Sequence, residues 1–348
     1  MIELSIPFLL SAILVMLTVL AVFIVYILFQ RSREVRFNKA RAVYLQTYSQ
    51  AWYAFLFQDA EFSIAMIPRG KAQVAAVEEI FSSYLKNVIN AEVTNKIQNS
   101  ANQYLKKFYA KDLTSRFWGV RMNALYRIAD FRINELLDEA LQFEQKKISK
   151  EEYFQLLKIY SILQPEIFLK KIKEARTRYS ESEYRRLFIL LSDDVFNQMF
   201  DDFYNNEQNI QLAIIDTTAV KRNMQFIENL KRLLNDESDE IKIRALKGLY
   251  EIGIVDEIDT YIPFVTSNVW EIRLMVAKIF KYAPLTYTYP YLEQLLQDEN
   301  WWVRSQAAKT IAEEREGVAK LQQFIAHADD QYAIEMVQET IVRKQGNR

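Results

Sequence analysis

Few side chains in this sequence are suited to catalysis or metal binding. His327 is the sole histidine, and the chain has no cysteine. A zinc site or a Ser-His-Asp triad therefore lacks its usual ligands and base. Adjacent carboxylates usually complement the dipole of the helix that they begin. Such pairs stand at Asp193–Asp194, Asp201–Asp202 and Asp329–Asp330. We expect no enzyme activity, no metal and no cofactor.

Arginines recur at a nearly regular interval in the C-terminal third. Arg244, Arg273 and Arg304 lie 29 and 31 residues apart, and each follows a β-branched residue. A small residue comes four positions after each arginine. These small residues are Gly248, Ala277 and Ala308. An arginine in the first turn of a helix can reach an acidic or carbonyl group of the adjacent helix pair. We hypothesise that these arginines, together with Arg121, set the register between repeats.

The elements that position these arginines are predicted to be pairs of helices joined by short polar turns. Glycine and proline number six each, which favours a mostly helical chain. Polar turns precede the three arginine segments, and their candidate N-caps are Asp239, Asn268 and Asn300. A helix pair cannot bury its apolar face alone, so pairs are expected to stack on one another. A small residue then lets neighbouring helices approach closely.

The segment WWVRSQAAKTIA at 301–312 resembles the HEAT repeat, a helical hairpin whose second helix carries a Val-Arg pair followed by alanines. GVRMNALYRIAD at 119–130 is a second good match, and the signature blurs between 131 and 225. The resemblance implies a HEAT-like α-solenoid of stacked helical hairpins. Together with the apolar segment described next, the predicted fold is all-α: an N-terminal transmembrane helix followed by this solenoid. The resemblance also implies a curved stack that presents one face to partners.

The N-terminal segment at 4–30 carries no charge, and its length is sufficient to cross a bilayer. A cleaved signal peptide would instead have basic residues before a shorter apolar run. The basic residues follow the segment here, which places the N-terminus outside and the bulk of the chain in the cytoplasm. They are Arg31, Arg33, Arg36, Lys39 and Arg41. This cluster sets the topology; alternatively, it also binds anionic lipid headgroups.

The remaining chain is expected to divide into regions of different character. Tyr44, Tyr48, Trp52 and Phe55 share one face of a helix that can continue unbroken from the span.

A net charge of −1 gives the chain no electrostatic reason to bind nucleic acid. The predicted domains are the anchor at 1–30, a juxtamembrane helix and linker at 31–70, degenerate helical repeats at 71–224, and HEAT-like repeats at 225–345.

Aromatic side chains supply the candidate binding surface. Neighbouring residues on a helix point about 100° apart, so Trp301 and Trp302 cannot both face one core. In one interpretation, both indoles pack as wedges between repeats. In the other, they form a surface for a protein partner, together with Trp270 and Tyr289. For Tyr289, lining a turn is the simpler alternative.

We predict a membrane-anchored cytoplasmic scaffold that binds a protein partner, expected to be part of a membrane-associated complex. The alternative is a module that binds anionic lipid surfaces, and an enzyme on this fold is less favoured.

Overall fold

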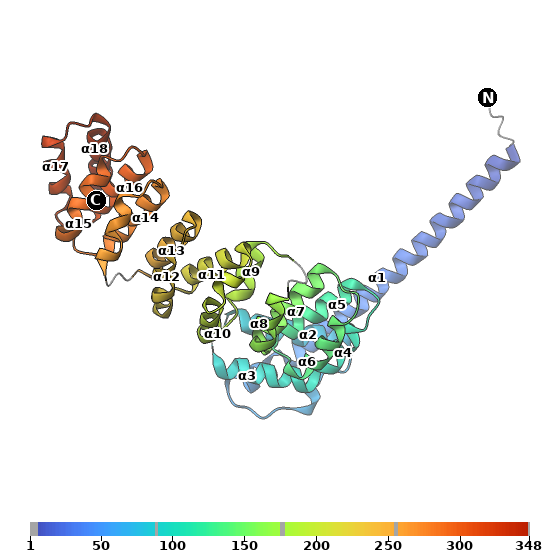
Figure 1. The fold of residues 1–348 in the computed structure, drawn as a ribbon. Helices are drawn as coiled ribbons and strands as arrows, with labels where there is room; N and C mark the ends of the chain where they lie inside the picture. The colour runs from blue at the N-terminus through green and yellow to red at the C-terminus, as the bar shows by residue number, and fades with distance from the viewer. Residues whose placement is uncertain (1–5, 88–89, 175–177, 254–256, 347–348) are drawn as a thin grey trace. The chain divides into compact units, whose positions relative to one another are not determined.

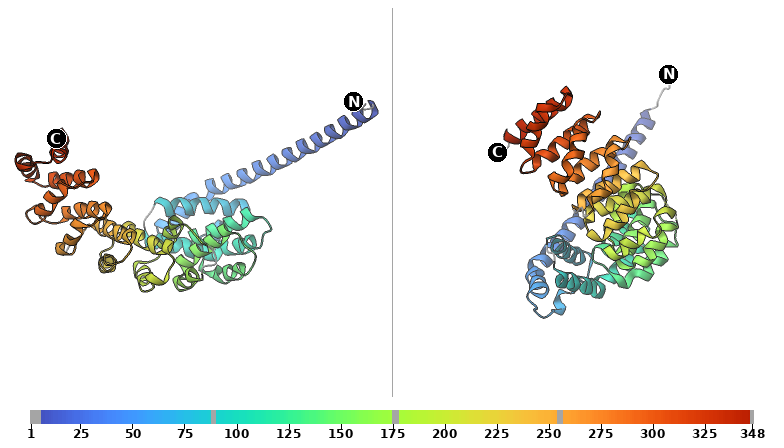
Figure 2. Two further views of the ribbon diagram at one scale, coloured as in Figure 1. Left: turned by 45° about the horizontal axis from the view of Figure 1, so that its top comes forward. Right: turned by 60° about the vertical axis from the view of Figure 1, so that its left-hand side comes forward.

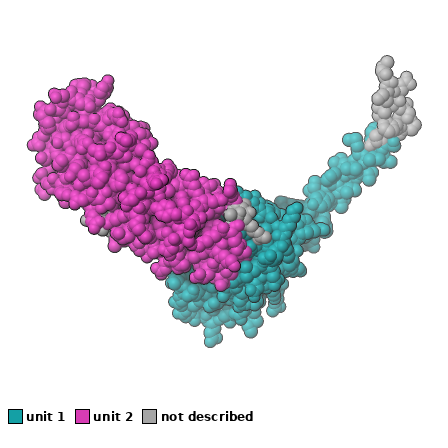
Figure 3. Space-filling model, viewed as in Figure 1, with its two compact units in different colours: residues 1–159 teal, residues 160–348 magenta. Residues whose placement is uncertain are grey.

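A computed structural model describes residues 6–87, 90–174, 178–253 and 257–346 (Figure 1). Every regular element within these ranges is a helix. The chain forms two compact units, residues 1–159 and 160–348 (Figure 3), and each is described by itself below. This division falls inside helix α7 (Lys150–Leu163).

The first unit begins with one continuous helix, α1 (Ile6–Phe57). The apolar segment and the juxtamembrane segment are therefore parts of the same rod, which is seen from two further sides in Figure 2. Tyr44 and Trp52 are buried while Tyr48 and Phe55 are half-buried, as the shared helical face predicted. The side chains at 31–40 are all exposed. The rod thus becomes part of the packed unit only in its last four turns.

The rest of the first unit covers this buried face. The sequence IPRGK at 67–71 predicts a break followed by a helix, with Val74, Val77, Phe81, Leu85 and Val88 on its buried side. The helix α2 does begin at Lys71; Val74, Val77 and Phe81 are buried, and Leu85 is half-buried. Val88, predicted on the same face, lies outside the described residues. The further helices of this unit are α2 (Lys71–Asn87), α3 (Ala91–Ser100), α4 (Lys106–Leu113), α5 (Trp118–Asp130) and α6 (Leu137–Glu144), with a π-helical turn at Ala101–Leu105 between α3 and α4.

The second unit is a series of short helices joined by short turns. Two 3-10 turns, Ile258–Thr260 and Ile262–Thr266, precede α14 in place of a regular helix. The helices are α8 (Pro165–Lys173), α9 (Glu181–Phe188), α10 (Asp193–Asn197), α11 (Gln208–Lys221), α12 (Ile227–Leu233), α13 (Asp239–Ile252), α14 (Trp270–Ile279), α15 (Leu285–Leu296), α16 (Trp301–Glu313), α17 (Gly317–His327) and α18 (Gln331–Gly346).

The second helix of each hairpin packs on the second helix of the next, in the order α9, α11, α13, α14, α16 and α18. We call these the stacking helices. The stack includes α9 and α11, whose sequences lack the Val-Arg signature. The predicted all-α solenoid of helical hairpins is confirmed, and within this unit it begins earlier than the signature does.

The small residues occupy the places where the stacking helices approach one another. A Cβ atom on Gly248 would lie 3.0 Å from Leu230 Cδ1 and 3.0 Å from Thr218 Oγ1. Ala277 is fully buried, and its carbonyl oxygen accepts a hydrogen bond from Thr310 Oγ1 at 2.8 Å. Close approach therefore explains why small residues follow the arginines.

Replacing Gly248 with valine should lower the free energy of unfolding by about 1–3 kcal/mol, because the added methyl groups overfill a packed contact. Gly119→Val is the matched control, since a Cβ there meets no atom within 4 Å. The measurement is the urea midpoint of the full chain in detergent micelles. Equal midpoints for the two variants would contradict the packing role of Gly248.

Candidate functional site

Three of the four predicted arginines close the turn that precedes their own helix. Arg121, Arg273 and Arg304 are each the fourth residue of their helix, α5, α14 and α16. In each case Nη1 donates to the carbonyl oxygen six residues earlier. The bonds run from Arg121 to Ser115 at 3.0 Å, from Arg273 to Ser267 at 2.6 Å, and from Arg304 to Asp298 at 2.6 Å. The same arginine position thus builds the same turn three times.

Two of these arginines also reach the next hairpin. Arg273 binds Asp298 through two bonds, Nε to Oδ2 at 2.5 Å and Nη2 to Oδ1 at 2.8 Å. Both side chains are more than nine-tenths buried, and the bond to Asp298 raises the pKa of Arg273. Arg121 binds Glu152 Oε1 at 2.7 Å, and Glu152 is buried in the first turn of α7. This geometry is the one that a register-setting role requires.

The other two arginines have different partners. Arg304 Nη1 also donates to the carbonyl oxygen of Glu299 at 3.1 Å, and the guanidinium lies 5.9 Å from the ring of Tyr332. Arg244 is the sixth residue of α13 rather than the fourth, and it points toward preceding hairpins. Its carboxylate partners are Glu181 at 2.7 Å, Asp216 at 2.9 Å and Glu240 at 2.6 Å. Four arginines in one sequence pattern therefore make three kinds of contact.

The paired tryptophans lie at the surface. Trp301 and Trp302 are the first two residues of α16, and they are 45% and 60% exposed. Their ring centroids lie 4.8 Å apart in an edge-to-face arrangement. The alternative in which both indoles are wedges between repeats is wrong. Val303, the next residue of the same turn, is fully buried, so the core-facing side of this turn is supplied by Val303 and not by either indole.

The other two residues of the predicted aromatic surface are more enclosed. Trp270 is the first residue of α14 and is half-buried. Tyr289 is half-buried within α15, so the alternative that placed it in a turn is wrong. Its hydroxyl donates to Glu293 Oε1 at 3.0 Å, and Lys320 Nζ lies 5.2 Å from its ring centroid. The freely accessible aromatic area is thus concentrated on Trp301 and Trp302.

Trp118 is a related surface residue that the sequence reasoning did not identify. It is the first residue of α5, is 49% exposed, and donates from Nε1 to Ser149 Oγ at 3.2 Å. The signal was present in the sequence, because WGVR, WEIR and WWVR each place tryptophan three residues before the turn-closing arginine. Tryptophan at the first helical position is therefore a repeated feature of the arginine-bearing helices.

The predicted N-caps are partly correct. Asn300 caps α16, and its side chain accepts from the Trp302 backbone N–H at 2.9 Å. Asp239 is the first residue of α13, after Ser238 as the cap, and Val269 rather than Asn268 is the cap of α14. Both of these predictions are wrong by one residue. The helix α13 begins one residue earlier than the polar composition suggests, and α14 begins one residue later.

The basic juxtamembrane residues lie in two environments. Arg31, Arg33, Arg36 and Lys39 are exposed along α1. Arg31 forms an exposed ion pair with Glu34 at 3.3 Å. Arg41 lies where the rod meets α2, and its Nε donates to Glu79 Oε2 at 3.0 Å. Four of the five predicted headgroup contacts are therefore on the free part of the rod.

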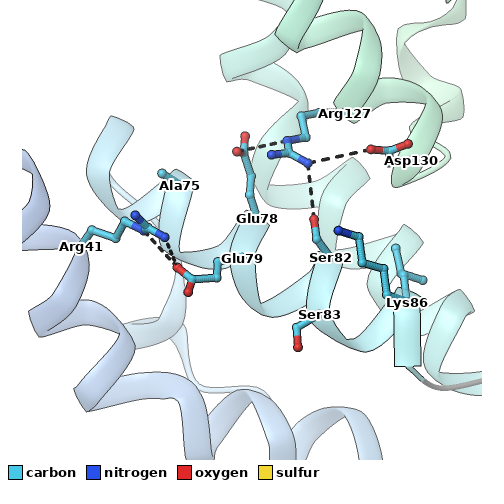
Figure 4. Close-up of a pocket in the computed structure, with 10 residues that line it drawn as sticks. Arg41, Ala75, Glu78, Glu79, Ser82, Ser83, Lys86, Arg127 and Asp130 are labelled. Carbon is cyan, nitrogen blue, oxygen red and sulfur yellow. Dashed lines mark hydrogen bonds and ion pairs between the residues drawn. The ribbon is translucent and has the colours of Figure 1, made fainter.

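Arg41 borders an open groove of about 690 Å³ in the first unit, between α1, α2 and α5 (Figure 4). Its charged residues largely face one another: Arg127 Nε lies 3.2 Å from Glu78, Arg127 Nη1 lies 3.8 Å from Asp130, and Arg41 binds Glu79. These ion pairs join the three helices. The groove has the composition of a structural contact between helices.

Among the described residues, no three histidine or carboxylate side chains are grouped so that they could hold a metal ion. His327 is the last residue of α17, is mostly exposed, and lies 3.3 Å from Glu293. Within the ranges that the structure describes, one helix, α1, is long and apolar enough to cross a membrane by length and composition. The fold and its surface thus define an all-α helical-repeat protein with a long apolar helix near its N-terminus.

Comparison with known proteins agrees with this class. Residues 289–313, which cover most of α15 and α16, match the family model of the HEAT repeat. The resemblance to the HEAT repeat is therefore confirmed at these residues. No curated protein matches the chain.

Among solved structures, two crystal structures of engineered proteins from the Northeast Structural Genomics Consortium are similar to the chain. The first is 14% identical, with 89% of this chain and 98% of that chain covered and a TM-score of 0.37. The second is 13% identical, with 78% and 96% covered and a TM-score of 0.26.

Proposed function

We propose that the protein is a membrane-anchored cytoplasmic scaffold that binds a protein partner through the aromatic surface of α16. The observation that carries the proposal is the exposure of Trp301 and Trp302, side by side at the start of a helix that is otherwise packed. Exposed tryptophan is costly in water and is enriched among the residues that dominate protein interfaces. Trp270 and Tyr289, both half-buried, are assigned to the same surface in this proposal.

The anchor in this proposal is the apolar part of α1. Because the helix continues unbroken into the packed first unit, insertion of its N-terminal half would hold that unit at the membrane. The exposed residues Arg31, Arg33, Arg36 and Lys39 follow the apolar part directly, so they would lie at the cytoplasmic headgroups. Tethering raises the local concentration of a partner in the same membrane without any new contact. A membrane-associated partner is therefore the economical choice.

The test is photo-crosslinking in intact cells, followed by isolation of membranes, a wash in alkaline carbonate, and identification of the crosslinked proteins by mass spectrometry. We expect the chain to remain in the washed membranes. We also expect one membrane-associated protein to be recovered with the native chain and to be lost with the Trp301→Ala, Trp302→Ala double variant. Because both side chains are exposed, the free energy of unfolding should change by less than about 0.5 kcal/mol.

Trp118→Ala is the matched control, since Trp118 holds the equivalent helix position in the first unit and is similarly exposed. This variant should recover the partner as the native chain does. Equal recovery with the double variant would exclude the aromatic surface. If the native chain enriches no protein at all, the scaffold function itself is wrong.

A further inference from the structure

A row of lysines crosses the stacking helices of the second unit at one repeated position. Counted from the first residue of each helix, the ninth residue is acidic in α11, lysine in α13, α14 and α16, and acidic again in α18. The five residues are spaced by 31, 31, 31 and 30 positions. They are Asp216, Lys247, Lys278, Lys309 and Glu339. Because these helices pack on one another in this order, the repeated position forms a row across the stack.

The ends of this row are neutralised by neighbouring arginines. Asp216 accepts from Arg244 Nη1 at 2.9 Å, and Glu339 accepts from Arg343 Nη2 at 2.5 Å. The three lysines between them differ. In the described part of the chain, no carboxylate oxygen lies within 4.0 Å of the amine of Lys247, Lys278 or Lys309. In the described part of the chain, the centre of the row thus consists of three lysines without an ion pair, and the acidic residue at each end is paired with an arginine.

The three amines are close enough to repel one another. Lys278 is the middle member and is half-buried. Burial lowers the pKa of Lys278, and the charges of Lys309 and Lys247 lower it further, while the Glu251 carboxylate acts in the opposite direction. The ring of Tyr250 partly offsets this repulsion, because its centroid lies 5.9 Å from the Lys278 amine. A row of like charges supported in this way favours an anionic ligand.

The spacing of the row indicates the form of that ligand. Packed helices lie roughly 8–10 Å apart, so lysines that extend in parallel from neighbouring helices would be separated by about that distance. A polyproline II chain advances about 3.1 Å per residue and has three residues per turn, so every third side chain returns to the same face about 9 Å further on. A segment with a carboxylate at every third residue would meet all three amines. A net charge of −1 on the whole chain disfavours nucleic acid as the ligand.

We propose that Lys247, Lys278 and Lys309 bind an extended acidic segment of a protein partner, whose carboxylates recur at every third residue. The inference rests on the proposed scaffold function for the nature of the partner as a protein. It does not involve the indoles of Trp301 and Trp302, so the two surfaces can be tested separately.

The test uses the full chain in nanodiscs of zwitterionic lipid and a fluorescein-labelled peptide that repeats Glu-Pro-Ala four times. Fluorescence anisotropy should show saturable binding that weakens as salt is raised from about 50 to 300 mM. A peptide of the same composition with its glutamates consecutive should bind more weakly. Lys278→Gln should reduce the affinity about three- to tenfold, since about 1.4 kcal/mol corresponds to a factor of ten. The Lys247→Gln, Lys278→Gln, Lys309→Gln triple variant should show no binding.

The matched control is the Lys107→Gln, Lys111→Gln, Lys147→Gln variant, which removes three exposed lysines of the first unit and should bind the spaced peptide as the native chain does. The Trp301→Ala, Trp302→Ala variant should also keep its affinity for the peptide. If the native chain binds the peptide but crosslinks to no partner, the proposal for the aromatic surface would be rejected. The proposal for the lysine row would stand.

Three results would overturn the inference. They are unchanged binding by the lysine-row triple variant, equal affinity for the spaced and the consecutive peptide, and binding of phosphatidylserine vesicles through these lysines without binding of either peptide. The last result would assign the row to a lipid surface. Circular dichroism of each variant checks that the helices remain intact.

Discussion

Replacing Arg273 with alanine is expected to lower the free energy of unfolding by about 3–5 kcal/mol, because the substitution leaves the buried Asp298 carboxylate without its counter-charge. Arg273 also holds the carbonyl oxygen of Ser267, so the turn before α14 loses its closing bond. Arg273→Lys should recover only part of this loss, since an ammonium cannot form the paired bonds that the guanidinium makes with Asp298. The measurement is the urea midpoint of the full chain in detergent micelles.

Two controls distinguish the contribution of the buried Arg273–Asp298 ion pair from that of the turn-closing hydrogen bond. Arg304→Ala removes the same turn-closing bond but no carboxylate contact, so it should cost only about 1 kcal/mol. The Arg273→Ala, Asp298→Ala double variant should be less destabilised than the sum of the two single variants, because neither charge then remains buried alone. An unchanged midpoint for Arg273→Lys would rule out a register-setting role for this arginine.

Replacing Trp52 with alanine is expected to cost about 3–5 kcal/mol, the range for removing a fully buried large aromatic side chain. The indole of Trp52 is completely buried, and its ring centroid lies 4.9 Å from that of Phe81 in α2 and 5.7 Å from that of Phe62. Trp52 Nε1 also donates to the Tyr44 hydroxyl at 3.1 Å. Burial raises the pKa of Tyr44 to about 12, so this hydroxyl is neutral and serves as both acceptor and donor at neutral pH.

The urea midpoint and limited proteolysis near residues 58–70 measure this effect. The variant should unfold at lower urea and be cleaved faster, because α1 loses its main contact with the first unit. Val43→Ala is the matched control on the exposed side of the same helix, and it should change the free energy of unfolding by less than about 0.5 kcal/mol. A normal midpoint with Trp52→Ala would mean that α1 is held to this unit by other contacts.

The aromatic surface shows the limit of periodicity as a guide to burial. Helical geometry predicted that Trp301 and Trp302 do not both face one core, but it did not reveal that both are exposed at the start of α16. Exposure at a helix start depends on where the preceding turn ends and where the neighbouring helix begins. Both are set by packing between segments far apart in the sequence.

The arginines show a similar limit. Their common spacing predicted one shared contact, and the shared turn-closing bond of Arg121, Arg273 and Arg304 agrees with this expectation. The carboxylate partners could not be derived in the same way. Arg244 stands two positions deeper in its helix, so its side chain meets the carboxylates of preceding hairpins instead of the next turn.

The lysine row was readable in principle, since Lys247, Lys278 and Lys309 recur at the repeat length. Whether these lysines form ion pairs could not be predicted from the sequence, because exposed lysines are common and a partner carboxylate can come from any neighbouring segment. The structure shows that the acidic residues at both ends of the row are paired with arginines. In the described part of the chain, the three lysine amines between them have no carboxylate oxygen within 4.0 Å. Only the packing order of the stacking helices places these residues in one row.

By itself, the sequence determined the helical class, the hairpin repeat, the long apolar helix and the positions that need small residues. These features depend on local periodicity, on turn composition and on the length of an uncharged run, all of which are written along the chain. The tertiary structure decided which tryptophans are exposed, which arginines meet a carboxylate, and which of the described lysines make no ion pair. Each of these depends on distances between side chains from different hairpins, and those distances are set only when the hairpins pack.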